Sequence, residues 1–94
     1  MYGIIIEVSV DPNREEEVRS MLNNMIVPQA RTHQGIKAAY WLRSLEGDIL
    51  RAIQIYDTET NARATANEIQ SQGPPPGAPV SLTSISTYEV IAHV

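Results

Sequence analysis

The pattern of hydrophobic and polar positions along the chain predicts alternating strands and helices. From Tyr2 to Val10 the residues are rich in β-branched types, and residues 11–13 close the run with turn chemistry, so the first element is expected to be a strand. The next apolar residues recur at helical spacing and form one stripe, Val18, Met21, Leu22, Met25 and Ile26. Asn13 with Glu16 fits an N-cap and its capping-box partner, so a first helix is expected to begin there.

Proline and glycine mark where this helix stops and a hairpin begins. Pro28 predicts that the helix kinks or ends just before it, and Gly35 marks the final stop. Residues 36–44 and 49–56 are predicted to be strands, because β-formers dominate both segments. The turn chemistry of residues 45–48 joins them, so the two strands should pair antiparallel.

A second helix and a last strand complete the pattern. Asp57 or Thr58 can cap a helix with one buried stripe, namely Ala62, Thr65, Ala66 and Ile69. Residues 73–79 contain four prolines, which fix φ and remove hydrogen-bond donors, so a stiff surface loop is expected. β-Formers dominate residues 80–94, and their alternation slips near residues 84–86, which predicts a bulge or bend.

The order strand, helix, strand, strand, helix, strand is that of the split βαβ, or ferredoxin-like, arrangement. We therefore expect one α+β domain over residues 1–94, with a four-stranded antiparallel sheet and two helices on one of its faces. Those helices can bury only one face, yet the strands are apolar on both: Ile5 points away from Ile4 and Ile6. A second copy of the chain is the expected cover for the other face, which predicts a homodimer; the alternative is a monomer with a partly apolar open face.

Composition narrows the classes of function. The chain has no cysteine, which excludes disulfides, thiolate nucleophiles and zinc–thiolate sites. Its net charge is −4 and its arginines are scattered singly, so it offers no basic stripe for nucleic acid. The apolar run at the N-terminus ends at Glu7, too short for a signal peptide or a membrane span. A cytoplasmic protein that binds neither nucleic acid nor membrane is expected.

Two groups of residues are candidates for chemistry. His33 lies just past the first helix with Arg31 two residues before it, which suits a general base beside a cation that holds an enolate or phenolate; the alternative is a solvated helix end. Tyr56 and Gln54 share one strand face and could offer a hydroxyl and an amide to a small aromatic ligand. The alternative for Tyr56 is a packed core residue with its hydroxyl at the rim.

Adjacent aromatic and charged residues in the strands raise further possibilities. Tyr40 and Trp41 must point to opposite faces, so one is expected on the ligand side and the other at the dimer seam. Glu7 and Arg51 are charged residues within apolar strands and are expected to form a structural ion pair. The second histidine, His93, has no partners gathered near it in sequence, so no metal site is predicted.

Several of these residues together resemble the antibiotic-biosynthesis-monooxygenase-like branch of the dimeric α/β-barrel superfamily. In that family the first helix ends in a proline-containing stretch, then an arginine, then a glycine, which correspond here to Pro28, Arg31 and Gly35. An aromatic strand follows, here Ala-Tyr-Trp-Leu at residues 39–42. The third strand of the family closes with an acidic residue, any residue, tryptophan, any residue and serine, and Gln-Ile-Tyr-Asp-Thr stands there at residues 54–58. The resemblance implies a ferredoxin-like fold, a dimeric barrel and a ligand pocket between helices and sheet.

The departures from the family pattern bear on function. Haem-degrading members depend on an asparagine, the strand tryptophan and a histidine, and Ile6, Tyr56 and Thr65 stand at those places, which argues against haem oxygenation. The resemblance implies instead a cofactor-independent monooxygenase that acts on a small aromatic or quinone-like compound, because such chemistry needs few titratable residues. A non-catalytic binding or assembly module and a small-molecule isomerase or cyclase that uses His33 are the alternatives.

Overall fold

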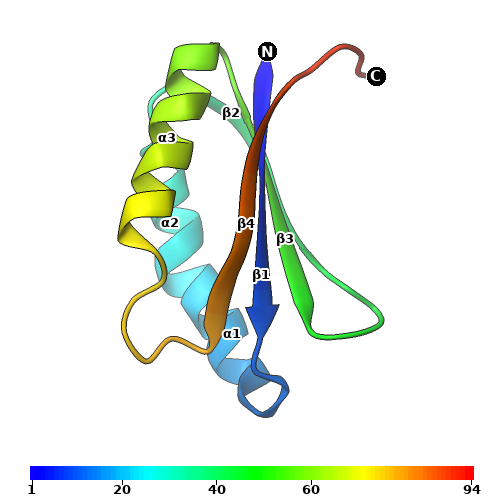
Figure 1. Ribbon diagram of the computed structural model, residues 1–94, viewed down its shortest axis with the longest axis vertical. Helices are drawn as coiled ribbons and strands as arrows, with labels where there is room; N and C mark the ends of the chain where they lie inside the picture. Colours follow the sequence, from blue (N-terminus) through cyan, green and yellow to red (C-terminus); the bar gives the residue numbers. More distant parts are fainter.

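The computed structural model describes all 94 residues and contains one four-stranded antiparallel sheet with helices on one face (Figure 1). The elements are β1 (Tyr2–Val10), α1 (Glu15–Met21), α2 (Val27–Ala30), β2 (Ile36–Arg43), β3 (Ile49–Tyr56), α3 (Glu59–Gln72) and β4 (Val80–Glu89). The strand order is β2-β3-β1-β4, with every neighbouring pair antiparallel. This arrangement confirms the predicted ferredoxin-like α+β fold. No helix is long and apolar enough to cross a bilayer.

The first helical segment is built from several kinds of turn. A 3-10 turn at Pro12–Arg14 precedes α1, and a π-helical turn at Leu22–Ile26 joins α1 to α2. In the wide turn the Val27 amide bonds to the carbonyl of Leu22, and Pro28 then falls in the first turn of α2, where a missing N–H is tolerated. The kink predicted at Pro28 therefore takes the form of a π-turn just before it.

The cap of this segment differs from the prediction. The Asp11 side chain accepts a hydrogen bond of 2.9 Å from the Asn13 amide and starts the 3-10 turn, while Arg14 precedes α1 without a side-chain cap. The capping box predicted for Asn13 and Glu16 is therefore wrong. An aspartate followed by a proline starts a tight turn as readily as Asn13 could cap a helix, and the chain uses the earlier residue.

The second helix and the last strand follow their predicted patterns more closely. Thr58 caps α3 by accepting from the Asn61 amide at 3.1 Å. The side chains of α3 that face the sheet are small and buried, so the helix can lie against β1, β3 and β4. The register of β1 with β4 shifts between Glu7 and Val8, so the predicted bulge lies at Thr83, just before the expected position. β4 ends at Glu89, and the predicted continuation to residue 94 is not a strand.

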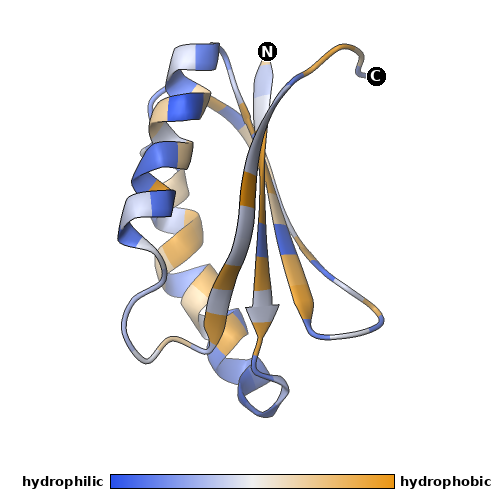
Figure 2. Cartoon of the chain, viewed as in Figure 1, coloured by the Kyte–Doolittle hydropathy of each residue, from blue (hydrophilic) through white to orange (hydrophobic).

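The core lies between the helices and the inner face of the sheet. Its largest fully buried side chains are Ile4, Val18 and Tyr56. Figure 2 shows apolar residues along the strands and on the helix surfaces turned toward them, while the outer turns of α3 are hydrophilic. The outer sheet face is also apolar: Tyr40 and Tyr88 are 63% and 50% exposed there.

Candidate functional site

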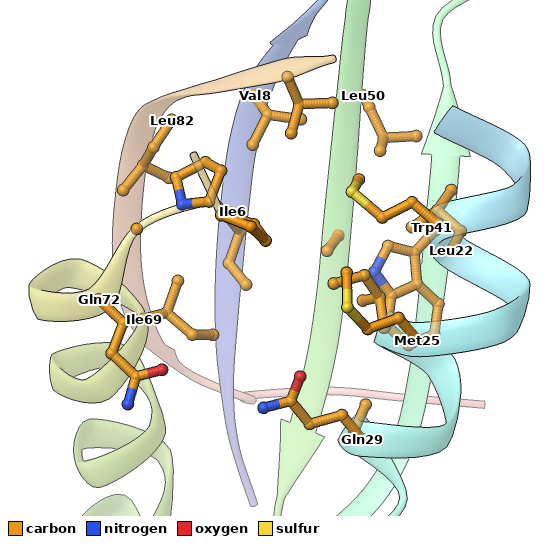
Figure 3. Close-up of a pocket in the computed structure, with 18 of the residues that line it drawn as sticks. Ile6, Val8, Leu22, Met25, Gln29, Trp41, Leu50, Ile69, Gln72 and Leu82 are labelled. Carbon is orange, nitrogen blue, oxygen red and sulfur yellow. The ribbon is translucent and has the colours of Figure 1, made fainter. Parts of the chain in front are cut away.

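A cavity of about 240 Å³ lies between the first helical segment, α3 and the sheet (Figure 3). The cavity exists because the first helical segment lies farther from the sheet than α3 does. Ala62 and Ala66 let α3 approach the strands closely, whereas the first helical segment presents bulkier side chains and stands farther from the sheet. Leu22, Met25 and Trp41 form one wall of the cavity, and residues of α3 and β4 form the opposite wall.

The lining is mainly apolar, with a few polar side chains among the 21 residues that surround the space, 13 of which are hydrophobic. Figure 3 shows Gln29 on α2 and Gln72 on α3 reaching toward the cavity from opposite sides. The other polar side chains in the lining are His33, Gln54 and Glu68. An apolar space with a few convergent polar groups is the usual form of a small-molecule site.

A chain of hydrogen bonds connects His33 to the sheet. Nδ1 of His33 lies 3.1 Å from the Tyr56 hydroxyl, which donates to Oε1 of Gln54 at 2.7 Å. Because that hydroxyl has one proton and gives it to Gln54, its oxygen can only accept from His33, which places the imidazole proton on Nδ1. Nε2 of His33 is then the free nitrogen, with a lone pair available as a base.

Tyr56 supports this arrangement from inside the core. The residue is 0% exposed and does not itself line the cavity. Burial raises the pKa of the Tyr56 phenol, and the nearby Glu68 carboxylate raises this pKa further; together they outweigh the opposite effect of the Thr65 hydroxyl. The phenol stays protonated at neutral pH, donates to Gln54 and accepts from Nδ1 of His33, and so positions the imidazole.

The structure brings together four of the six residues predicted for the site. His33, Trp41 and Gln54 line the cavity, and Tyr56 lies one hydrogen bond from His33. Trp41 is on the inner sheet face, opposite Ala52 of β3.

The other two predicted residues lie elsewhere. Arg31 is exposed past the end of α2 and does not line the cavity. Tyr40 is on the outer face, paired with Ile53 of β3, so it belongs to the expected dimer seam. A phenolate in the cavity therefore has no arginine in its wall, and any stabilising cation there has to come from His33 itself.

The sequence reasoning missed three polar lining residues. Gln29 could have been found, because Met25, Gln29 and His33 continue one helical stripe at steps of four. Gln72 continues the predicted stripe of α3 three residues after Ile69, whereas Glu68 gives no comparable signal, since α3 has polar residues on most of its surface. Their role depends on how α3 sits relative to the first helical segment, which local spacing does not specify.

A second, polar hollow of about 350 Å³ adjoins the cavity. Its lining shares Gln29, His33 and Glu68 with the apolar cavity, so these three residues form a neck between the two spaces. The remaining residues around it are Thr32, Gln34, Asn61, Ala64 and Thr65. We refer to this hollow as the vestibule; Ala64 is its one hydrophobic lining residue.

Comparison with known proteins supports the fold. No protein-family model and no curated protein sequence matches the chain. The heme degrader MhuD from Mycobacterium tuberculosis, solved with two hemes bound in its active site, matches with a TM-score of 0.79 and 16% identity over 100% of this chain and 99% of that chain. A monooxygenase from the gene ActVA-Orf6 of Streptomyces coelicolor, in complex with nanaomycin D, matches with a TM-score of 0.63 and 14% identity over 99% and 89%.

A third solved structure is a dimeric ferredoxin-like protein from an uncultured marine organism. It matches with a TM-score of 0.67 and 7% identity over 100% of this chain and 98% of that chain. These neighbours are of the kind that the sequence resemblance predicted, and the likeness is one of fold.

The residues at the cavity do not fit a haem. The volume of about 240 Å³ is below the range of roughly 300–1,000 Å³ for sites that hold drug-sized ligands. Thr65, at the place where the sequence resemblance puts the histidine of haem-degrading members, is 6% exposed and offers only a hydroxyl.

Proposed function

We propose that this protein is a cofactor-independent monooxygenase that oxidises a small phenolic or quinone-like compound with dioxygen. The observation that carries the proposal is one histidine in the wall of an apolar cavity, held in a single tautomer by a buried tyrosine. The monooxygenase among the solved neighbours, which binds nanaomycin D, adds support from the fold.

The size and character of the cavity favour a single aromatic ring. An apolar cavity of about 150 Å³ holds benzene, so about 240 Å³ accommodates a ring with one or two substituents. The indole of Trp41 and the side chains of Leu22 and Met25 supply apolar and sulfur contacts that suit a ring. Gln54 and Gln29 supply amides that can orient its hydroxyl or carbonyl groups.

The proposed reaction begins with proton transfer to His33. Nε2 removes the proton of the bound phenol, and the resulting imidazolium stabilises the phenolate in a site with little water. The electron-rich ring then reduces dioxygen: one oxygen atom enters the ring as the second carbonyl of a quinone, and the other leaves as water with the displaced protons. Because the ring supplies all the electrons, the protein has only to bind, orient and deprotonate the substrate.

The same histidine also favours a second candidate function. A base with a free Nε2 beside an apolar cavity can move a proton within a small lactone or polyketide, which is the chemistry of an isomerase or cyclase. The two functions differ in whether dioxygen is consumed. A binding module of the same fold would show neither oxygen uptake nor product.

The test is an oxygen-electrode assay of the purified protein with a panel of single-ring phenols and small lactones, with products identified by mass spectrometry. Oxygen uptake that depends on the phenol, falls about 10²-fold or more in His33→Ala and yields the quinone would support a monooxygenase. Isomerised product without oxygen uptake would establish the second candidate instead. Binding of the phenols without any product would leave a binding module and overturn both enzyme functions.

We also infer that the chain forms a homodimer through the outer sheet face. Tyr40, Leu42 and Tyr88 are exposed on this face, and Ile5 pairs with Ile53 there. The Glu7–Arg51 ion pair, at 2.8 Å, neutralises the two charges that would otherwise be buried singly. The dimeric ferredoxin-like neighbour supports this interpretation. A second copy stacked on the face would bury both tyrosines.

A further inference from the structure

We propose that the vestibule selects substrates by the charge of the substituent on the phenol ring, here called the tail. The protein binds phenols with an amine in the tail in preference to phenols with a carboxylate there, and Glu68 causes this preference. The inference rests on the proposed function, because it assumes that the aromatic ring occupies the apolar cavity. It adds the second half of the ligand, a polar tail that leaves the cavity through the neck at Gln29, His33 and Glu68.

The linings of the two spaces favour a ligand with two different ends. The apolar cavity suits a ring, whereas the vestibule beside it is lined almost entirely by amides, hydroxyls, the His33 imidazole and one carboxylate. A substituent that crosses the neck therefore exchanges water for side chains that donate and accept hydrogen bonds. A purely apolar tail would make no hydrogen bond with these groups, so a polar tail is favoured.

The charges around the vestibule decide which polar tail is favoured. Glu68 is the carboxylate of its lining, and the lining contains no lysine or arginine. The nearest arginine along α3, Arg63, is paired with Glu59 at 2.7 Å. None of the ion pairs in the chain involves Glu68, so its charge is not already neutralised.

The influence of Glu68 reaches the interior of the site. Its negative charge is one of the causes that raise the pKa of the buried Tyr56 phenol. A group with this effect on Tyr56 also acts on a ligand that passes beside it through the neck. An ammonium tail is attracted to Glu68, a neutral hydroxyl is tolerated by the amides, and a carboxylate tail is repelled.

The experiment compares phenols that differ mainly in the tail: tyramine, tyrosol, phloretic acid and p-ethylphenol. Trp41 is the single tryptophan of the chain and lines the cavity, so quenching of its fluorescence reports ligand binding without any need for turnover. We expect tyramine to bind about tenfold more tightly than phloretic acid at low salt, with tyrosol between them. Added salt should reduce the ratio of the two affinities, that for tyramine over that for phloretic acid.

Two variants with the same change in net charge distinguish the local effect of the Glu68 carboxylate from the effect of the protein's net charge. Glu68→Gln should bring the amine and the acid to within about twofold of each other. Glu16→Gln, at an exposed position on α1 away from both hollows, should keep the wild-type ratio. Both positions are on helix surfaces, so neither substitution should impair folding.

The outcomes separate this inference from the proposed function. Equal binding of the amine and the acid, preference for the acid, or a preference that survives Glu68→Gln would overturn the inference, even if p-ethylphenol is oxidised. The amine preference without oxygen uptake would uphold the inference and overturn the monooxygenase. If none of the four phenols quenches Trp41, both are wrong.

Discussion

Nδ1 of His33 lies 3.1 Å from the phenolic oxygen of Tyr56, although the two residues are 23 positions apart in the chain. The contact joins the loop after α2 to the end of β3, and it continues to Gln54 through the Tyr56 hydroxyl. The orientation of the candidate base is therefore set by a residue of the core. A substitution in the core should therefore change the rate of the reaction without altering any group that touches the ligand.

Removing the Tyr56 hydroxyl tests this dependence. Tyr56→Phe leaves Nδ1 of His33 and Oε1 of Gln54 without their partner, so the free energy of unfolding should fall by about 1–3 kcal/mol. The imidazole is then free to take the other tautomer, so turnover should fall and the pH–rate profile should shift. Denaturant unfolding and a pH–rate series measure the two effects. Thr60→Val, which removes an exposed hydroxyl on α3 away from the cavity and the outer sheet face, is the control and should change neither. An unchanged pH–rate profile in Tyr56→Phe would contradict the positioning role.

Gly35 should tolerate a side chain less well than Gly47 does. Its φ is +80°, and a Cβ there would collide with Oδ1 of Asp57 and the amide of Asn61. Gly47 has a similar φ of +82° but open space around it, so Gly47→Ala should cost only the backbone penalty of about 1–2 kcal/mol. Gly35→Ala should cost distinctly more in denaturant unfolding. Equal losses in the two variants would show that the collision is relieved without cost.

The dimer should depend on the outer sheet face. Tyr40 is 63% exposed in the single chain, so Tyr40→Lys should not disturb the fold but would place a charge in the interface. Sedimentation velocity should show a dimer for the wild type and a monomer, or a much weaker dimer, for the variant. Asn67→Lys, at an exposed position on α3, adds the same charge away from that face and should remain dimeric. A monomeric wild type at high concentration would rule out the interface.

Stability should fall in acid because of Glu15. Its hydrogen bond from Arg43, with Nε to Oε1 at 3.1 Å, holds the pKa of the Glu15 carboxyl below its ordinary value of 4.5. Since the unfolded chain binds this proton more readily, the stabilisation is complete above about pH 4.5 and is lost as the pH falls through the lower, folded-state pKa. Thermal unfolding of Glu15→Gln should therefore differ from wild type at neutral pH and converge with it in acid. Glu16→Gln, outside every ion pair, should show no such convergence.

The order and type of the elements could be predicted because they depend on neighbours in sequence. The helical stripe from Val18 to Ile26 and the β-branched run from Tyr2 to Val10 differ in period, and period separates helix from strand before any tertiary contact forms. The Thr58 cap is equally local. Even the error at Asn13 was local, because Asp11 competed for the same turn with similar chemistry.

The sequence by itself determined the βαββαβ fold and the apolar character of both sheet faces, since both follow from alternation and the order of the elements. It also predicted an ion pair between Glu7 and Arg51, and the structure places that pair across β1 and β3 within one chain. Only the tertiary structure decided that Trp41 faces the cavity and Tyr40 the outside, because alternation shows that the two differ but not which is inside. It also decided that Tyr56 holds His33. The cavity is the space left because bulky side chains hold the first helical segment farther from the sheet than α3. No local sequence pattern predicts such a space.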